Sequence, residues 1–243
     1  MSLYREQAVV LRTHKLGEAD RIVVLMSAGR GKVRAVAKGI RKTKSRIGGR
    51  LEPPGHVSLL MFEGRNLDVV SQVESLDHYR PIHEDLDRMT DALAMLEAVD
   101  QVAQEGEANG PLYKMLTGAL RTLSDAPERP ALLVGAFYWK LLALEGVAPV
   151  LDGCVRCGPD REIVAFDAVE GGALCREHRR GPAVEPATLE LIRRILGGQL
   201  GSALAEPAGP AVSAASALAT STLEVHLERR LRTVHLLGHA GPT

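Results

Sequence analysis

Aromatic residues are scarce in this sequence of 243 residues, since Phe, Trp and Tyr together make up 3% of it. Because Ala, Leu, Val and Gly are abundant instead, we expect aliphatic cores and helices that pack through small side chains. No run of residues approaches the roughly 20 apolar positions that span a membrane, so the sequence predicts no membrane segment. The charged content of 25% indicates a soluble globular chain with room for one large domain or several small ones.

Cysteine is also rare, because the chain has only three. An odd number leaves one thiol over from any disulfide pairing. No apolar signal segment comes before the first charged residues, so we expect a cytoplasmic location in which disulfides do not persist. All three cysteines lie between Cys154 and Cys175, and a disulfide framework does not explain this clustering.

The cysteines and one histidine have the spacing of a structural zinc ribbon. Cys154 and Cys157 form a C-x2-C pair, Cys175 and His178 form a C-x2-H pair, and seventeen residues separate the two pairs. Four protein ligands leave no open position for water, so we expect one structural zinc ion and no metal-based catalysis. Glycines beside both pairs allow tight turns, and EIVAF between them predicts a short strand.

Two other interpretations of this segment stay open. A redox-active C-x2-C pair would fit the first two cysteines, but the βαβ pattern of thioredoxin-like folds is missing around it. Alternatively, the ribbon has lost a ligand, and His178 is a surface histidine beside Arg179 and Arg180.

Strand-like runs dominate the first 80 residues. Short β-branched runs alternate there with Gly, Pro and Asn turns, and the runs are QAVVL, DRIVVLM, KVRAVAKG, HVSLLMFE and LDVVSQVE. Five strands at this spacing predict a small closed β-barrel of the OB-fold type. The turn EGRN between the last two runs indicates a hairpin.

After Pro81 the hydrophobic period becomes helical. The next residues predict an apolar stripe over an acidic outer face, and the stripe comprises Leu86, Met89, Leu93, Leu96, Val99 and Val102. PALLVGAFYWKLLALEG is apolar nearly all round, which predicts a buried central helix. Helical pattern resumes at Pro186, and again at Ser216 after a predicted loop at 205–215.

These patterns predict an α+β chain of several domains. An OB-fold barrel at 1–80 precedes an all-α domain at 81–150 and 181–243, from which a zinc ribbon at 151–180 protrudes. Charge divides in a similar way, because residues 1–80 carry 15 Lys and Arg against 8 Asp and Glu, whereas 81–150 carry 5 against 11. The net charge of zero is thus a cancellation, which suggests units with different partners.

A basic stretch without acids runs from Arg30 to Arg50. Lys32 and Arg34 alternate with apolar residues, which places them on the outer face of a strand. A cationic strand face followed by a basic loop predicts a groove that binds nucleic acid through its phosphates. The predicted contacts are Arg30, Lys32, Arg34, Lys38, Arg41, Lys42, Lys44, Arg46 and Arg50.

A solvated charged surface without a ligand is the alternative interpretation of this stretch. Few aromatic residues accompany it, because Tyr4, Phe62 and Tyr79 are the only ones before residue 80. We therefore expect phosphate contact to dominate over base stacking.

Motifs of catalytic sites are missing from the sequence. SAGRGKV superficially resembles a phosphate-binding loop, but Met26 stands where the first glycine belongs and Val33 where the Ser or Thr belongs. The sequence also has no H-E-x-x-H and no G-x-S-x-G motif. We therefore expect a protein that is not an enzyme.

The amino-terminal segment resembles the RecO family of bacterial recombination mediators. It shares a G-E-x-D turn at 17–20, an AKG-[IV]-R-[KR] strand end at 37–42 and an L-x-P motif at 51–53. The resemblance extends over essentially the whole chain and implies an OB-fold front, a helical body and a zinc-binding insertion. Family members with the metal usually have four cysteines, and His178 departs from that set.

The resemblance implies a function in DNA repair and homologous recombination. RecO proteins bind single- and double-stranded DNA, anneal complementary strands and engage the single-strand-binding protein, and together with RecR they help to load RecA. A nucleoid-associated location in the cytoplasm, away from membranes, follows. The alternative is a zinc-ribbon RNA-binding or transcription factor that uses the same barrel, and competition between DNA and RNA would separate the two.

Overall fold

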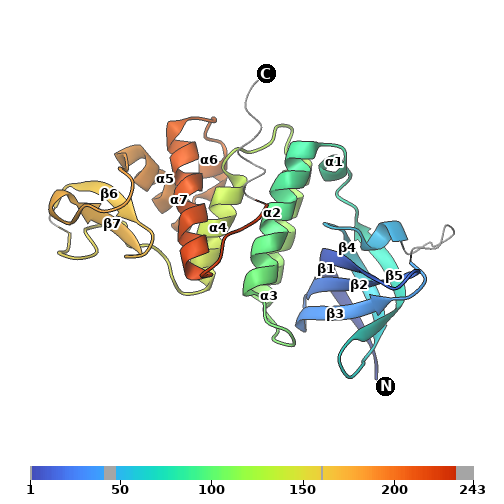
Figure 1. Ribbon diagram of the computed structural model, residues 1–243. Coiled ribbons are helices and arrows are strands. Elements are labelled where there is room, and N and C mark those ends of the chain that lie inside the picture. The colour runs from blue at the N-terminus through green and yellow to red at the C-terminus, as the bar shows by residue number, and fades with distance from the viewer. Residues whose placement is uncertain (1, 41–47, 160, 234–243) are drawn as a thin grey trace. The chain divides into compact units, whose positions relative to one another are not determined.

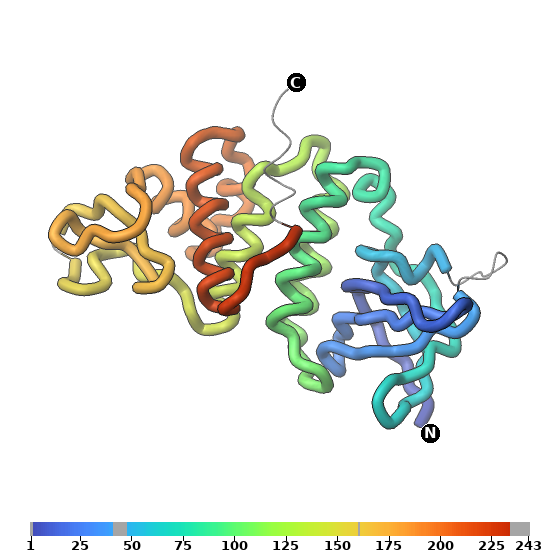
Figure 2. Tube along the Cα trace, viewed as in Figure 1, coloured from blue at the N-terminus to red at the C-terminus, as the bar shows by residue number. Residues whose placement is uncertain are grey.

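The chain divides into two compact units in the computed structural model (Figure 1, Figure 2). The structure describes residues 2–40, 48–159 and 161–233. The first unit includes Met1–Ala126, and the second consists of Pro127–Val234.

Five strands close into a barrel in the first unit. They are β1 (Leu3–Leu16), β2 (Asp20–Ser27), β3 (Gly31–Ala37), β4 (His56–Phe62) and β5 (Asp68–Asp77), and a short 3-10 helix η1 (Gly48–Leu51) precedes β4. The order round the barrel is β1-β2-β3-β5-β4, and β4 pairs back onto β1. Neighbours are antiparallel except β3 and β5, which are parallel. The predicted OB-fold barrel is confirmed.

The barrel core is aliphatic, as the scarcity of aromatic residues predicts. Buried Val, Leu, Ile, Met and Ala side chains fill it, and Tyr4 packs against it from a partly buried position. Along β3 the odd-numbered residues from Gly31 to Ala37 are buried, whereas Lys32 and Arg34 lie on the outer face. Each large aliphatic side chain removed from water contributes about 1.5–3 kcal/mol, and the same alternation leaves the basic side chains outside.

Three helices follow the barrel within the first unit, and they are α1 (Arg80–His83), α2 (Leu86–Val102) and α3 (Gly110–Asp125). Both α2 and α3 contact β1, and they also contact each other. The Asp85 side chain caps α2 by accepting hydrogen bonds from the backbone N–H groups of Asp87 and Arg88. Asn109 caps α3 in the same manner.

The apolar stripe predicted for α2 is correct in its middle and wrong at its start. Leu96 and Val99 are buried, but Leu86 is 81% exposed because it is the first residue of the helix. The predicted acidic outer face is also wrong in part, since Asp91 and Asp100 are buried. A surface helix buries only one face, but α2 contacts β1 and both neighbouring helices. More of its circumference is therefore buried.

The second unit is a helical body of α4 (Leu133–Leu144), α5 (Pro186–Leu196), α6 (Leu200–Leu204) and α7 (Pro210–His226). As predicted, α4 is largely buried, and it contacts the other three helices. The indole N–H of Trp139 donates to the backbone carbonyl of Ala215 in α7, with an N–O distance of 3.0 Å. In the part of the chain that the structure describes, no helix combines the length and hydropathy that crossing a membrane requires.

A small hairpin lies between α4 and α5 in the chain (Figure 1). Its strands are β6 (Ile163–Asp167) and β7 (Gly172–Cys175), and the 3-10 helix η2 (Arg176–His178) follows. The strand predicted from EIVAF is therefore present. The rings of Trp139 and Phe166 meet edge to face with centroids 5.9 Å apart, which ties β6 to α4.

The last helix begins earlier than predicted. The sequence predicts a loop at 205–215, but α7 starts at Pro210. Proline is well tolerated in the first turn of a helix, where its missing N–H has no intrahelical partner to lose. The helix ends at His226, so the predicted helical pattern beyond that residue is not continued in the described residues.

Packing divides the chain at a different place from the change in hydrophobic period. The sequence predicts a border after residue 80, whereas the first compact unit extends to Ala126. The reason is that α2 and α3 contact the barrel, partly through the ion pair of Arg12 with Asp100. The domain boundaries at residues 80, 150 and 180 stay predictions.

Two helical glycines offer a matched test of the packing. A Cβ on Gly135 of α4 would lie 2.6 Å from Ser216 Oγ and 2.8 Å from Ser216 Cα. Gly135→Ala should therefore lower the free energy of unfolding by about 1–3 kcal/mol through overpacking. A Cβ on Gly118 of α3 would meet nothing within 4 Å, so Gly118→Ala should raise the free energy of unfolding by about 0.5–1 kcal/mol.

Urea unfolding followed by circular dichroism measures both changes. An unchanged stability of Gly135→Ala would contradict the close approach of α4 and α7.

Candidate metal centre and nucleic-acid interface

Three cysteines and one histidine meet in the hairpin of the second unit. The sulfurs of Cys154, Cys157 and Cys175 and a ring nitrogen of His178 all lie within 4.8 Å of one another. Cys175 ends β7, His178 ends η2, and the first two cysteines lie in the loop before β6. The four residues predicted as metal ligands are therefore brought together.

Three of the six distances between the ligand atoms are close to those of a tetrahedral metal site. Cys157 Sγ lies 3.7 Å from Cys175 Sγ, and His178 Nδ1 lies 3.4 Å from Cys175 Sγ and 3.6 Å from Cys154 Sγ. Bonds of about 2.3 Å to sulfur and about 2.05 Å to nitrogen imply tetrahedron edges of about 3.8 Å and about 3.5 Å respectively. The four ligand atoms could hold one metal ion between them.

A tight turn shapes the first pair of ligands. Cys154 and Gly158 exchange two backbone hydrogen bonds, each with an N–O distance of 2.9 Å. Gly158 has a φ of +93°, which glycine adopts without strain. A Cβ on Gly153 would lie 2.7 Å from Pro159 Cα, so the turn leaves no room for a side chain there. The flanking glycines noted in the sequence thus have a steric purpose.

Electrostatics within the cluster favour a cation. Burial opposes ionisation of Cys154, but hydrogen bonds from the backbone N–H groups of Cys175, Arg156 and Cys157 lower the pKa of its thiol to about 6. Burial and the neighbouring sulfurs of Cys154 and Cys175 raise the pKa of Cys157 to about 12. Three thiolates this close repel one another, and a bound divalent cation removes that repulsion.

The predicted nucleic-acid contacts lie in the first unit. Of the nine basic residues, Arg41, Lys42, Lys44 and Arg46 lie outside the described residues. Lys38 and Arg50 are exposed, and the Arg50 guanidinium donates to the backbone carbonyl of Val73 with an N–O distance of 3.0 Å. The outer face of β3 carries Lys32 and Arg34, as the alternation predicts.

Acidic side chains meet this basic face. Lys32 Nζ lies 2.6 Å from the backbone oxygen of Asp100 and 3.6 Å from its carboxylate, which also accepts from Arg12 Nε at 2.6 Å. Arg34 pairs with Glu105 at 3.8 Å. The sequence did not predict these contacts, because only complementary charge connects residues so far apart in the chain.

The segment after α2 lies along the edge of β3. The Lys32 N–H donates to Gln104 O at 3.1 Å, and the Gly106 N–H donates to Lys32 O at 3.2 Å. A Cβ on Gly31 would lie 1.8 Å from Glu107 O, so this approach requires glycine. β5 pairs with β3 only at Ala35 and Val36, so it leaves backbone groups at the start of β3 without a strand partner. The segment after α2 supplies hydrogen bonds to those groups.

A pocket of about 230 Å³ opens between this segment and the loop that joins β4 to β5. Its lining includes Arg30, Lys32 and Arg34 from the β3 region, Arg65 and Asn66 from the loop, and Glu105. In OB folds, this loop and the face of β2 and β3 bind oligonucleotides. The pocket therefore lies at the position that binds oligonucleotides in other OB folds.

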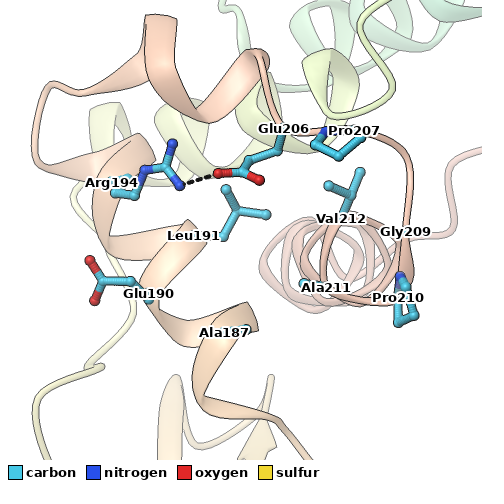
Figure 3. Close-up of a pocket in the computed structure, with 10 residues that line it drawn as sticks. All are labelled: Ala187, Glu190, Leu191, Arg194, Glu206, Pro207, Gly209, Pro210, Ala211 and Val212. Carbon is cyan, nitrogen blue, oxygen red and sulfur yellow. Dashed lines mark hydrogen bonds and ion pairs between the residues drawn. The ribbon is translucent and has the colours of Figure 1, made fainter.

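A second pocket, of about 280 Å³, lies in the helical body between α5 and α7 (Figure 3). Leu191, Val212 and Pro210 contribute apolar surface to it. Among its charged residues, Arg194 binds Glu206 with an N–O distance of 2.5 Å. This ion pair joins α5 to the segment before α7. The charged residues Arg194 and Glu206 therefore stabilise the fold.

Two family models match the chain. The model described as Recombination protein O N terminal matches residues 1–79, and the model described as Recombination protein O C terminal matches 83–235. The chain belongs to the RecO family. This membership supports a role in DNA repair and recombination with a DNA-binding OB-fold barrel, and it favours DNA over the RNA-binding alternative. The resemblance noted in the sequence is confirmed.

Within this RecO protein, Lys32 and Lys38 provide a test of which basic residues are free for DNA. Lys38 is exposed, so Lys38→Gln should flatten the logarithmic salt dependence of single-strand binding by about 0.7. Lys32 is held by Asp100, so Lys32→Gln should lower the free energy of unfolding by about 1–3 kcal/mol and change the salt dependence less.

Binding titrations at several salt concentrations and urea unfolding measure the two effects. A larger change of the salt dependence for Lys32→Gln than for Lys38→Gln would mean that Lys32 leaves Asp100 to bind a phosphate.

Proposed function

We propose that this protein is a non-enzymatic mediator of homologous recombination that binds single- and double-stranded DNA and anneals complementary strands. The observation that carries the proposal is that a chain matched by both RecO family models has basic side chains on the outer face of its OB-fold barrel. The proposal includes DNA-binding contacts on the barrel. These are Arg30, Arg34, Lys38 and Arg50, together with basic residues of the loop between Lys38 and Arg50.

Phosphate binding on the barrel would allow annealing without a catalysed reaction. Side chains on one face of a β-strand, such as Arg34, can neutralise a DNA backbone while the base edges stay free to pair. Repulsion between two phosphate backbones is the main barrier to their approach, and cationic residues lower it. No nucleotide hydrolysis is needed for this step.

The partners that we propose follow the family. They are RecR, the single-strand-binding protein and, through them, RecA, at the nucleoid in the cytoplasm. DNA and the protein partners would bind different surfaces of the chain. The acidic charge of residues 81–150 supports this, since it repels DNA phosphates from most of that segment and leaves the segment to protein partners.

The metal that we propose is one structural zinc ion at Cys154, Cys157, Cys175 and His178. Three thiolates and one imidazole form a ligand set that zinc prefers, and the four ligands complete its coordination. The hairpin has a small core in which Cys154 and Cys175 pack with Ala165 and Leu174. A bound ion would therefore supply stability that so few apolar residues cannot.

The zinc proposal predicts one zinc ion per chain in the purified protein. Cys157→Ser should release the ion and lower the melting temperature, because closed sites bind zinc with about 10 kcal/mol or more. His178→Ala should weaken binding, whereas His178→Cys keeps a complete ligand set and should retain the ion.

Elemental analysis and thermal unfolding test these variants. Absence of stoichiometric zinc, or its retention by Cys157→Ser, would overturn the proposal, and full retention by His178→Ala would remove His178 from the ligand set.

The annealing proposal predicts that complementary oligonucleotides pair faster with the protein than alone, without ATP and without added metal. The acceleration should fade as salt screens the phosphate contacts. Replacing Arg41 and Lys42 together by Ala should flatten the logarithmic salt dependence of binding by about 1.4.

Fluorescence quenching of paired labelled strands measures the rate. An unchanged rate with the protein present, or a requirement for ATP hydrolysis by this chain, would contradict annealing by electrostatic neutralisation.

A further inference from the structure

Arg30 differs from the other basic residues of the barrel in what surrounds its guanidinium. Its central carbon lies 3.9 Å from the centroid of the Tyr4 ring, which places one face of the group on the aromatic ring. Glu63 Oε1 lies 3.4 Å from Nη1 of Arg30 and thus pairs with the edge of the guanidinium. The Arg30 side chain is nevertheless 41% exposed and lines the barrel pocket.

Rigid neighbours hold both members of this stack. Tyr4 lies in β1, pairs with Met61 of β4, and donates its hydroxyl hydrogen bond to Asp68 of β5. The Arg30 N–H donates to the hydroxyl of Ser27, which is fully buried, with an N–O distance of 3.0 Å. The stack is therefore fixed by three strands and a tight turn before any ligand binds.

The surface that remains available on Arg30 is a flat cationic face. The Tyr4 ring covers one face of the guanidinium and Glu63 pairs with part of its edge, so the opposite face is the part that stays available to a ligand. Guanidinium planes stack on nucleobases, and an aromatic ring beneath the guanidinium fixes that plane. A base in a duplex has both faces covered by its neighbours, so only an unpaired base presents a free face.

We propose that Arg30, stacked on Tyr4, is a platform for one unpaired nucleobase of a DNA strand bound to the barrel. The phosphate next to that base lies against Arg34 or Arg65 at the rim of the pocket, and Asn66 offers an amide to the base edge. This inference rests on the proposed DNA binding and adds to it a contact that distinguishes single-stranded from double-stranded DNA.

Two charge-conserving variants test the platform. Arg30→Lys and Arg34→Lys both keep a positive charge, but only the first removes the stacked plane. A stacked base contributes about 1–3 kcal/mol, so Arg30→Lys should weaken binding of a thymidine oligonucleotide by about 5- to 150-fold. Arg34→Lys should weaken it much less, and neither variant should change the salt dependence, because the number of charges is unchanged.

An oligomer of abasic sugar phosphates separates stacking from phosphate contact. Arg30→Lys should bind it as well as the wild-type protein does, because it has no base to stack. Tyr4→Phe keeps the ring and should retain thymidine binding, whereas Tyr4→Leu should resemble Arg30→Lys. Circular dichroism and urea unfolding of each variant verify that the barrel is folded.

The outcomes are distinguishable. Equal effects of Arg30→Lys and Arg34→Lys on the thymidine oligonucleotide, or an equal loss on the abasic oligomer, would overturn the platform and leave DNA binding by the barrel intact. Failure of the wild-type protein to bind either oligomer at low salt would overturn both proposals.

Discussion

The two-residue period of β3 is the constraint on which the nucleic-acid face depends. In a closed barrel of five strands, each side chain points either into the core or out to solvent, and the core of this barrel accepts only aliphatic residues. Val33 and Ala35 occupy the inward positions, so Lys32 and Arg34 must point outward. A shift of one residue would bury both charges, at a cost that the barrel could not sustain. The basic face is therefore a consequence of folding the core.

The acidic residues that pair with this basic face explain part of the zero net charge. The sequence suggests that opposite charges belong to separate units with different partners, yet Asp100 and Glu105 pair with Lys32 and Arg34 inside the first unit. Part of the cancellation is thus local. Since a salt bridge of exposed groups contributes little to stability, the pair of Arg34 and Glu105 can yield to a phosphate. The more buried contact of Lys32 with Asp100 holds α2 on the barrel instead.

What the sequence could predict follows from how local each signal is. Strands, central helix α4 and the set Cys154, Cys157, Cys175 and His178 depend on residues close together in the chain, and all are found as expected. Burial of Asp100 and the stack of Arg30 on Tyr4 depend on contacts between distant segments, which a one-dimensional pattern does not encode. The early start of α7 is a different case, because small residues and Pro210 have weak preferences that tertiary packing overrides.

The scarcity of aromatic residues finally bears on mechanism. Of the three aromatic residues before residue 80, Tyr79 is fully buried, Phe62 is 39% exposed at the end of β4, and the Tyr4 ring lies against the guanidinium of Arg30. A protein that stacked every base would hold a strand tightly but would cover the surfaces that must pair with a second strand. One platform at Arg30 can fix the position of a strand, while phosphate contacts supply most of the affinity and can be released by salt. The annealing that we propose would require this balance, because a strand has to be held by its backbone and leave with its bases paired.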